Sequence, residues 1–327
     1  MVGSVTSVFG EPDDFEAALR ADGVLSLLVT GHGRFRARLT ELTLHDLCLS
    51  AGDEHLPRIA FIAIPADTVL VSLPIGSGPW PVWGGIESQA SEIITFGPDQ
   101  RVYARSDGPC RWGAIRLPAE DFAQYGRALS GAELVLPPAG RWRSPRAALR
   151  QLLRLHQAAV RRVEARSDVL ADAEAAHGLE QQVIEALVEC LSAGSVEEET
   201  EGAARHRAVL ARLEDLLASE PLLGVADICT ALDVSERMLR ECCNRHLGIG
   251  PSRYLRGRRM QRVHRALRSE ASGGLSVSEV ARRHRFHDLG RFAANYRAIY
   301  GELPSATSRR RDRTAELTLG RPRVKVS

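Results

Sequence analysis

Polar side chains recur on one side of a predicted helix in the C-terminal third of the chain, and their chemistry suits contact with base edges. The helix follows Ser235, a residue type that commonly caps helix N-termini. Leu239 and Cys243 have the spacing of its inward face. The outward positions carry Arg237, Arg240, Glu241 and Asn244. Because arginine can bind guanine through two hydrogen bonds and glutamate can accept one from cytosine, we predict that Ser235 and these four residues contact DNA.

The same pattern occurs a second time, 53 residues further along the chain. "LRECCNRHLGIGPS" (239–252) and "FAANYRAIYGELPS" (292–305) match at this constant offset. In both copies the glycine fits a helix C-terminus, and the Pro-Ser pair fits the first turn of the following helix. A short helix precedes each copy, and the second of these opens with Ser276 and Glu279 at the spacing of a capping box. The sequence therefore predicts two helix-turn-helix units.

The outward surface of the second unit carries fewer hydrogen-bonding groups than that of the first. Ala294 offers only a methyl group, which can contact the methyl group of thymine. Arg291 and Arg297 are expected to hold phosphates rather than bases. The residues of this unit that we predict to contact DNA are His287, Arg291, Asn295 and Arg297.

A single predicted helix joins the two units. It runs from Pro251 to about Ser269, and at 1.5 Å per residue it would be roughly 28 Å long. This length is close to the ~34 Å that separates successive major-groove entries on one face of DNA. A rigid spacer of this size would present both units to one side of a duplex. The helix also carries a basic row of Arg258, Arg262 and Arg265, of which we predict that Arg262 contacts DNA.

From about residue 209 to 310 the chain resembles the AraC/XylS family of transcription regulators. The resemblance rests on "LGIGPSRYLRGRRM" after the first unit and on "VARRHRFHDLGRFAANYRAIYGELPSATSRR" in the second. It implies that Arg237, Arg240 and Glu241 read bases. It also implies a ligand-responsive activator of a catabolic operon, working as a homodimer on double-stranded promoter DNA. A small-molecule effector and RNA polymerase would be its further partners.

Two positions depart from the family pattern. Members commonly carry a long polar side chain where Ala294 stands, and glycine where Arg285 stands in the turn of the second unit. Turns of this kind favour glycine, because the residue at this position tends to adopt a positive φ. A non-glycine residue there costs on the order of 1 kcal/mol, which Phe286 and Phe292 can offset by anchoring the unit in its core. We therefore predict a folded second unit with a strained turn.

The N-terminal part has a different pattern from the C-terminal third, with short extended runs followed by predicted helices. "VLSLLVT", "RIAFIAI", "TVLVSL", "SEIITF" and "WGAIRL" lie between about 24 and 117, separated by Gly, Pro, Asp and Ser clusters typical of a barrel or sandwich. Helical periodicity then covers 144–166 and 179–193. The second helix carries the apolar stripe Val183, Leu187, Cys190 and Leu191, which caps the barrel or pairs with a second subunit. We predict a dimer through this stripe.

The predicted fold is α+β, with a cupin-like β-barrel and capping or dimerising helices before an all-α domain of two helix-turn-helix units and a linking helix. The cupin-like sensor domain is implied by the family resemblance. Aromatic side chains in the barrel segment either line a ligand pocket or fill the core. The candidate ligand-binding residues are Trp80, Trp83, Tyr103 and Trp112. The predicted divisions are 1–140 (sensor), 141–192 (helices), 193–204 (acidic, aperiodic linker), 205–310 (DNA-binding domain) and 311–327 (basic tail).

Composition and charge narrow the function classes. From residue 205 onward there are 25 Lys and Arg against 13 Asp and Glu, a net charge of +12, whereas the rest of the chain carries −10. A basic C-terminal third suggests a polyanion partner for that part alone. No stretch approaches the ~18 apolar residues of a membrane helix. Because the first residues contain neither a basic nor an apolar signal region, we expect no secretory signal. We expect a cytoplasmic protein without a membrane partner.

Catalytic and metal-binding motifs are missing from the sequence. The six cysteines show no metal spacing, and GxSxG and P-loop signatures are absent. His32, His45 and His55 lie too far apart for a cupin metal triad. We therefore expect no enzyme activity, no cofactor and no metal. Two alternatives stay open, namely a cupin-type enzyme with an accessory helical domain and a non-specific DNA-binding protein.

Overall fold

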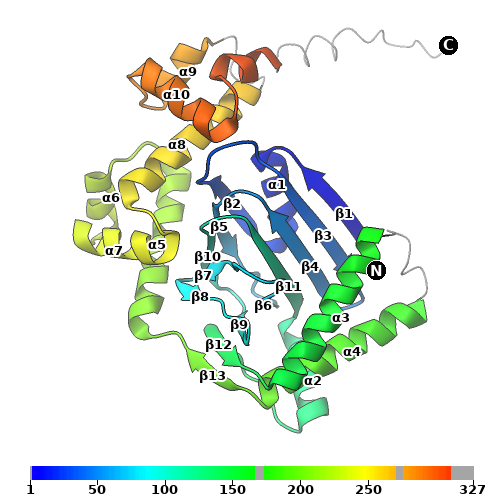
Figure 1. Ribbon diagram of the computed structural model, residues 1–327. Helices are drawn as coiled ribbons and strands as arrows, with labels where there is room; N and C mark the ends of the chain where they lie inside the picture. Colours follow the sequence, from blue (N-terminus) through cyan, green and yellow to red (C-terminus); the bar gives the residue numbers. More distant parts are fainter. Residues whose placement is uncertain (1, 166–172, 270–274, 311–327) are drawn as a thin grey trace, which may run out of the picture.

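The computed structural model describes residues 2–165, 173–269 and 275–310, so the predicted basic tail lies outside the described residues. A β-rich N-terminal body stands beside a helical C-terminal body (Figure 1). The strands are β1 (Gly3–Phe9), β2 (Val24–Val29), β3 (Ala37–Thr43), β4 (Cys48–Glu54), β5 (Arg58–Ala63), β6 (Thr68–Leu73), β7 (Val82–Trp83), β8 (Ile86–Glu87), β9 (Glu92–Phe96), β10 (Arg101–Ser106), β11 (Cys110–Pro118), β12 (Ala139–Arg143) and β13 (Ser195–Glu198). The helices are α1 (Pro12–Ala18), α2 (Ala119–Ser130), α3 (Arg146–Ala165), α4 (Ala173–Ser192), α5 (Glu201–Ser219), α6 (Val225–Leu232), α7 (Glu236–Leu247), α8 (Pro251–Arg268), α9 (Val277–Arg283) and α10 (Leu289–Tyr300), and a short 3-10 turn covers Leu19–Asp22.

Two antiparallel sheets form the N-terminal body. The larger has the order β1-β3-β4-β11-β6-β9-β12-β13, and the smaller has the order β2-β5-β10-β7-β8. Their inner faces share one core, in which Ala60 and Ile62 of the small sheet meet Leu70 and Ile94 of the large one. The sequence left a barrel and a sandwich open, and the hydrogen-bonded strand order gives two separate sheets that face each other.

Helices cover both outer faces of this pair of sheets, which makes four layers. On the large sheet, α2, α3 and α4 pack over residues such as Leu49 and Ile115. On the small sheet, Ile59 and Phe61 point outward into the core of the first helix-turn-helix unit, beside Leu210 and Leu239. Because both faces of β5 are buried, its sequence is a continuous apolar run rather than an alternating one.

The five predicted extended runs are all strands, but the sequence pattern missed others. β1, β3, β4, β10 and β12 were not predicted, and each carries charged residues or glycine among its apolar ones. In "ARLTELT" (β3), for example, four of the seven residues are polar and they do not alternate regularly with the apolar ones, and Thr40 is nevertheless buried. Pairing with other strands determines these elements, and a short sequence window does not contain that information.

The helices after the β-rich segment form as predicted, but the predicted dimer stripe is not available. α3 and α4 pack against each other, and Val183, Leu187 and Leu191 are at most 1% exposed within a single chain. The prediction of a dimer through this stripe was wrong, because α3 and the large sheet already cover it. The capping alternative is the one that forms. No helix among the described residues is long and apolar enough to span a membrane.

The segment predicted as an aperiodic linker contains regular structure. Ser195–Glu198 pairs with β12 as an edge strand, with Trp142 opposite Val196. Helix α5 begins at Glu201, where the Thr200 side chain accepts a hydrogen bond from the Ala203 amide. The acidic side chains that suggested a loose linker instead meet arginines, since Arg141 pairs with Glu197. A cut at residue 205 would therefore remove the first turn of α5.

A buried polar cluster joins the two bodies. The Glu214 carboxylate on α5 accepts hydrogen bonds from the Tyr103 hydroxyl of β10 at 2.7 Å and the Tyr254 hydroxyl of α8 at 2.5 Å. The Arg258 guanidinium lies 3.3 Å from the same carboxylate. Burial is the main reason that the pKa values of both tyrosine hydroxyls are raised. These four side chains are the polar centre of the contact between the small sheet and the helices.

Candidate nucleic-acid interface

The first helix-turn-helix unit consists of α6 and α7. Ser235 caps α7, and its side chain accepts a hydrogen bond from the Met238 amide at 3.1 Å. Leu239 and Cys243 are fully buried in the unit's core, as predicted. The turn between the helices contains Asp233 with φ of +53°, a conformation that Asp tolerates better than most residues. The cap and the turn that begin α7 are therefore local features of the sequence.

The outward face of α7 presents the predicted base-reading side chains to solvent. Arg237, Arg240, Glu241 and Asn244 are all exposed. Arg240 forms an ion pair with Glu236, one turn earlier, with 2.7 Å between nitrogen and oxygen. Exposed pairs of this kind contribute only about 0.3–0.5 kcal/mol, so DNA can displace the pair at little cost. This face combines bidentate donors with one acceptor, which is the chemistry needed to distinguish bases in the major groove.

The second unit consists of α9 and α10, and its caps form as predicted. Ser276 and Glu279 make a reciprocal capping box at the start of α9. Asp288 caps α10 by accepting a hydrogen bond from the Arg291 amide at 2.9 Å. Phe292 and Tyr296 are buried in the core of the unit. The prediction that Arg285 takes a positive φ is confirmed, with φ of +61°.

The two recognition helices differ in what they expose. His287 in the turn before α10 is exposed, and so are Arg291, Ala294 and Arg297 on α10. Asn295, which we predicted to contact DNA, is half-buried and lines a groove that faces the N-terminal body. The second unit thus offers two arginines and a histidine for contact with DNA. At the positions of α10 that correspond to Glu241 and Asn244 of α7, it has no hydrogen-bond acceptor.

The basic row on the linking helix lies mostly against protein. α8 spans Pro251–Arg268, as predicted, and Arg262 donates a hydrogen bond from its guanidinium to the Leu217 carbonyl at 2.6 Å. Arg258 joins the buried Glu214 cluster. The proposed DNA contact of Arg262 would therefore require this side chain to leave Leu217. The row packs against α5 and the N-terminal body rather than forming a solvent-facing stripe.

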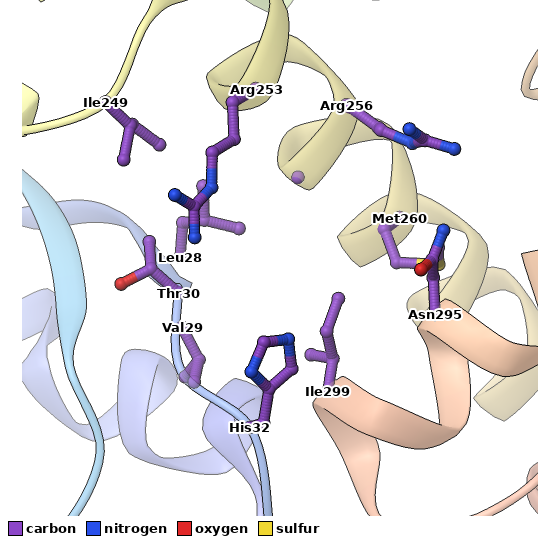
Figure 2. Close-up of a pocket in the computed structure, with 11 residues that line it drawn as sticks. Leu28, Val29, Thr30, His32, Ile249, Arg253, Arg256, Met260, Asn295 and Ile299 are labelled. Carbon is purple, nitrogen blue, oxygen red and sulfur yellow. The ribbon is translucent and has the colours of Figure 1, made fainter.

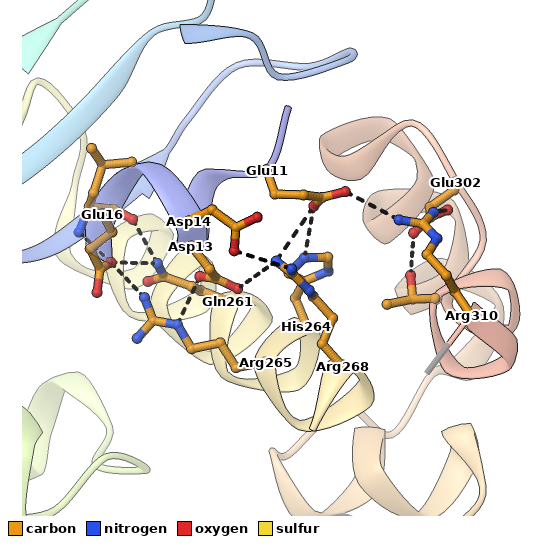
Figure 3. Close-up of polar contacts among 12 residues, drawn as sticks. Glu11, Asp13, Asp14, Glu16, Gln261, His264, Arg265, Arg268, Glu302 and Arg310 are labelled. Atoms are coloured by element: carbon orange, nitrogen blue, oxygen red, sulfur yellow. Dashed lines mark hydrogen bonds and ion pairs between the residues drawn. The ribbon is translucent and has the colours of Figure 1, made fainter. Parts of the chain in front are cut away.

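An acidic helix of the N-terminal body meets the far half of α8. Arg265 on α8 forms ion pairs with Asp13 at 2.9 Å and Glu16 at 2.5 Å, both on α1 (Figure 3). Arg268 lies 3.3 Å from Asp14. This contact was not predicted from the sequence, although the acidic run "EPDDFE" (11–16) is a signal for a cationic partner. It holds the second helix-turn-helix unit against the N-terminal body.

The predicted ligand-binding aromatic residues do not form one pocket. Trp83 and Trp112 line an internal cavity of about 30 Å³ between the two sheets, which has room for about one water molecule. Trp80 is half-buried and donates a hydrogen bond to the Ile75 carbonyl, and it does not line this cavity. Tyr103 points the other way, into the Glu214 cluster. Grouping Tyr103 with the tryptophans was wrong because alternate residues of β10 face opposite sides of the sheet.

A larger hollow lies between the two bodies. This interdomain groove has a volume of about 230 Å³ and is bordered by the segment after β2, by α8 and by α10 (Figure 2). Arg253 and Arg256 provide positive charge at its rim, and Asn295 and Thr30 provide polar groups. Its apolar wall consists of Leu28, Val29, Ile249, Met260 and Ile299.

Two capped helix-turn-helix units joined by one helix, each with an outward basic surface, define the C-terminal body as a double helix-turn-helix domain. A family model described as a helix-turn-helix domain matches residues 228–310. The XylDLEGF operon transcriptional activator of Pseudomonas putida is 38% identical over 76 residues, which make up 23% of this chain and 24% of that relative. The HTH-type transcriptional activator RhaS of Salmonella arizonae is 27% identical over 220 residues, 65% of this chain and 74% of that relative. The crystal structure of the AraC-like transcriptional activator CuxR is 16% identical with a TM-score of 0.41, covering 81% of this chain and 96% of that one.

The C-terminal body is a helix-turn-helix domain of the AraC/XylS family, a family of transcription regulators and not of enzymes. The match to the Pseudomonas relative spans about a quarter of that protein's length. Membership in this family implies that the domain binds DNA. The residues that carried the resemblance in the sequence run from the end of α7 into α8, and from α9 through α10 to residue 310.

Arg285→Gly is expected to raise the free energy of unfolding by up to about 1 kcal/mol, or to leave it unchanged, because glycine adopts positive φ without a steric cost. As a matched control, Ala294→Gly in the exposed middle of α10 should lower it by about 1 kcal/mol. Urea unfolding of both variants measures the difference. A large destabilisation by Arg285→Gly would show that the arginine side chain holds the turn in some other way.

Proposed function

We propose that this chain is a sequence-specific DNA-binding transcription regulator that activates an operon. The observation that carries the proposal is the exposed face of α7, where Arg237, Arg240 and Glu241 stand on a helix that is capped at Ser235 and anchored by a buried core. Activation is inferred from the relatives, which are named as operon activators.

The two units have different roles in this proposal. α7 enters the major groove and reads base edges, with its arginines on guanine and Glu241 on cytosine. α10 enters the next major groove, where Arg291 and Arg297 hold phosphates and Ala294 contacts a thymine methyl. The 18 residues of α8 span roughly 27 Å and set the distance between the units. Recognition would therefore be stronger in one half of the site than in the other.

We further propose that the interdomain groove of Figure 2 binds the effector. Two guanidinium groups beside an apolar wall suit a small anionic molecule with an apolar body. Such a molecule would contact β2, α8 and α10 together, so its binding would change how firmly the second unit is held to the N-terminal body. The cavity between the sheets is too small for this purpose in the present conformation.

Genomic DNA capture with the purified full-length chain tests the proposed function. Sequencing of the retained fragments should yield a small set of sites that share a motif. The affinity for such a site should exceed that for mixed competitor DNA by at least about 10³-fold, and it should fall steeply with salt. Equal affinity for site and competitor would favour the non-specific DNA-binding alternative.

The same binding assay tests the effector site. Small carboxylic acids with an apolar body are expected to change the affinity of the wild-type chain for its site, and an Arg256→Ala chain should not respond. If no such acid changes the affinity, or if the variant responds like the wild type, the groove is not the effector site.

A further inference from the structure

Two histidines and a glutamate meet on the surface of the N-terminal body, far from the helix-turn-helix units. His45 lies in the turn between β3 and β4, whereas His177 and Glu180 lie one turn apart on α4. The His45 Nδ1 atom is 2.9 Å from Glu180 Oε2, and the His177 Nδ1 atom is 4.0 Å from the same oxygen. All three ligand atoms lie within 4.8 Å of one another. This spacing approaches the roughly 3.4 Å between donors around a tetrahedral zinc ion with bonds of about 2.1 Å.

The glutamate is held in place, and the imidazoles are free to adjust. The Glu180 side chain is only 3% exposed, and its second oxygen accepts a hydrogen bond from the Asp46 amide at 2.8 Å. The rings of His45 and His177 are 44% and 64% exposed, so small side-chain rotations can bring both nitrogens onto one ion. Fixed outer contacts of this kind orient metal ligands.

The surroundings of this triad are acidic. Asp46 follows His45 directly, and the Tyr125 hydroxyl of α2 lies 3.4 Å from its carboxylate. Burial and the nearby carboxylates of Asp46 and Glu120 raise the pKa of Asp121. In the described part of the chain, none of the Asp46, Glu120 and Asp121 carboxylates forms an ion pair with an arginine. A divalent cation at the triad would therefore enter a region of negative potential.

We propose that His45, His177 and Glu180 bind a zinc ion that fastens α4 to the turn between β3 and β4. Imidazole nitrogens with one carboxylate suit zinc and related transition metals, whereas magnesium and calcium prefer oxygen ligands alone. Three protein ligands leave a fourth position for water. His45 and Glu180 are 135 positions apart in the sequence, so the ion would tie distant parts of the sensor body together.

Titration of the full-length, chelator-treated chain with zinc chloride by calorimetry tests this proposal, with elemental analysis of the dialysed protein alongside. One equivalent of zinc should bind, and it should raise the Tm because only the folded chain presents the site. His177→Ala should weaken zinc binding by at least about 100-fold. This is the largest loss expected when a residue that only hydrogen-bonds to a metal ligand is removed. Alanine on this exposed helical surface should leave the fold intact. The control is His55→Ala, which removes another exposed histidine and should bind zinc like the wild type.

Two outcomes would overturn the proposal. Failure of the wild-type chain to bind zinc would mean that His45 and Glu180 form only a hydrogen-bonded pair. Zinc binding that persists unchanged in both His177→Ala and Glu180→Gln would place the ion elsewhere, for example on cysteine. Neither outcome bears on DNA binding, because the triad lies on the face of the large sheet opposite the helix-turn-helix units.

Discussion

Replacing Arg240 with alanine is expected to weaken binding to the specific DNA site by about 1–3 kcal/mol and to relax the base preference at one position. The side chain is exposed on α7 and its only ion pair among the described residues is with Glu236, so the loss would come from DNA contacts and not from stability. A binding-site selection with the wild-type and variant chains measures both effects, since it reports affinity and preference at each position.

Two further variants make this result specific. Arg291→Ala on α10 should weaken binding uniformly across sequences and reduce the salt slope by about 1, as expected for a phosphate contact. Glu236→Gln removes the partner of Arg240 but keeps the arginine, so its base preference should match that of the wild type. Equal loss of preference from Arg240→Ala and Arg291→Ala would contradict the proposed asymmetry between the two units.

The second large effect is expected at the Glu214 cluster. Glu214→Leu should destabilise the chain by about 3–5 kcal/mol, because it leaves the Arg258 charge buried without its carboxylate. Arg258 is only 14% exposed and Glu214 only 5%, so solvent screens this pair weakly. The Tyr103 and Tyr254 hydroxyls would also lose their shared acceptor. Urea unfolding monitored by tryptophan fluorescence measures the change.

The double variant Glu214→Leu, Arg258→Leu separates the charge from the packing. It should recover much of the lost stability, because replacing both members of a buried pair with apolar groups is often close to neutral. Single variants that cost less than about 1 kcal/mol would be typical of an exposed pair and would contradict the description of a buried cluster.

The helix-turn-helix units could be predicted from sequence because their determinants are local. Ser235 and Ser276 lie within one turn of the backbone amides they bond, and Arg285 takes its positive φ from the turn geometry that surrounds it. Buried positions such as Leu239 and Phe292 follow from helical spacing alone. Caps, turns and periodicity act within a few residues, so a single sequence contains them.

The contacts between elements that lie far apart in the sequence could not be predicted in the same way. Helical periodicity showed that Arg258 and Arg265 share one side of α8, but not that Glu214 and Asp13 lie opposite them. Arg265 and Asp13 are 252 positions apart, and nothing in either segment specifies the other. The same limit applies to His45. The histidines near it in the sequence gave no metal-binding pattern, because its partners His177 and Glu180 lie on α4. Burial of α4 against α3 likewise depends on the tertiary fold.

Hydroxyl-radical footprinting of the full-length chain on its genomic site tests the central claim most directly. Two helix-turn-helix units separated by α8 should protect two segments on one face of the duplex, about 10–10.5 base pairs apart from centre to centre. Protection should be stronger in the segment where Arg240→Ala changes the pattern. A single protected segment, or uniform protection along the DNA, would contradict the account of a sequence-specific reader with two units.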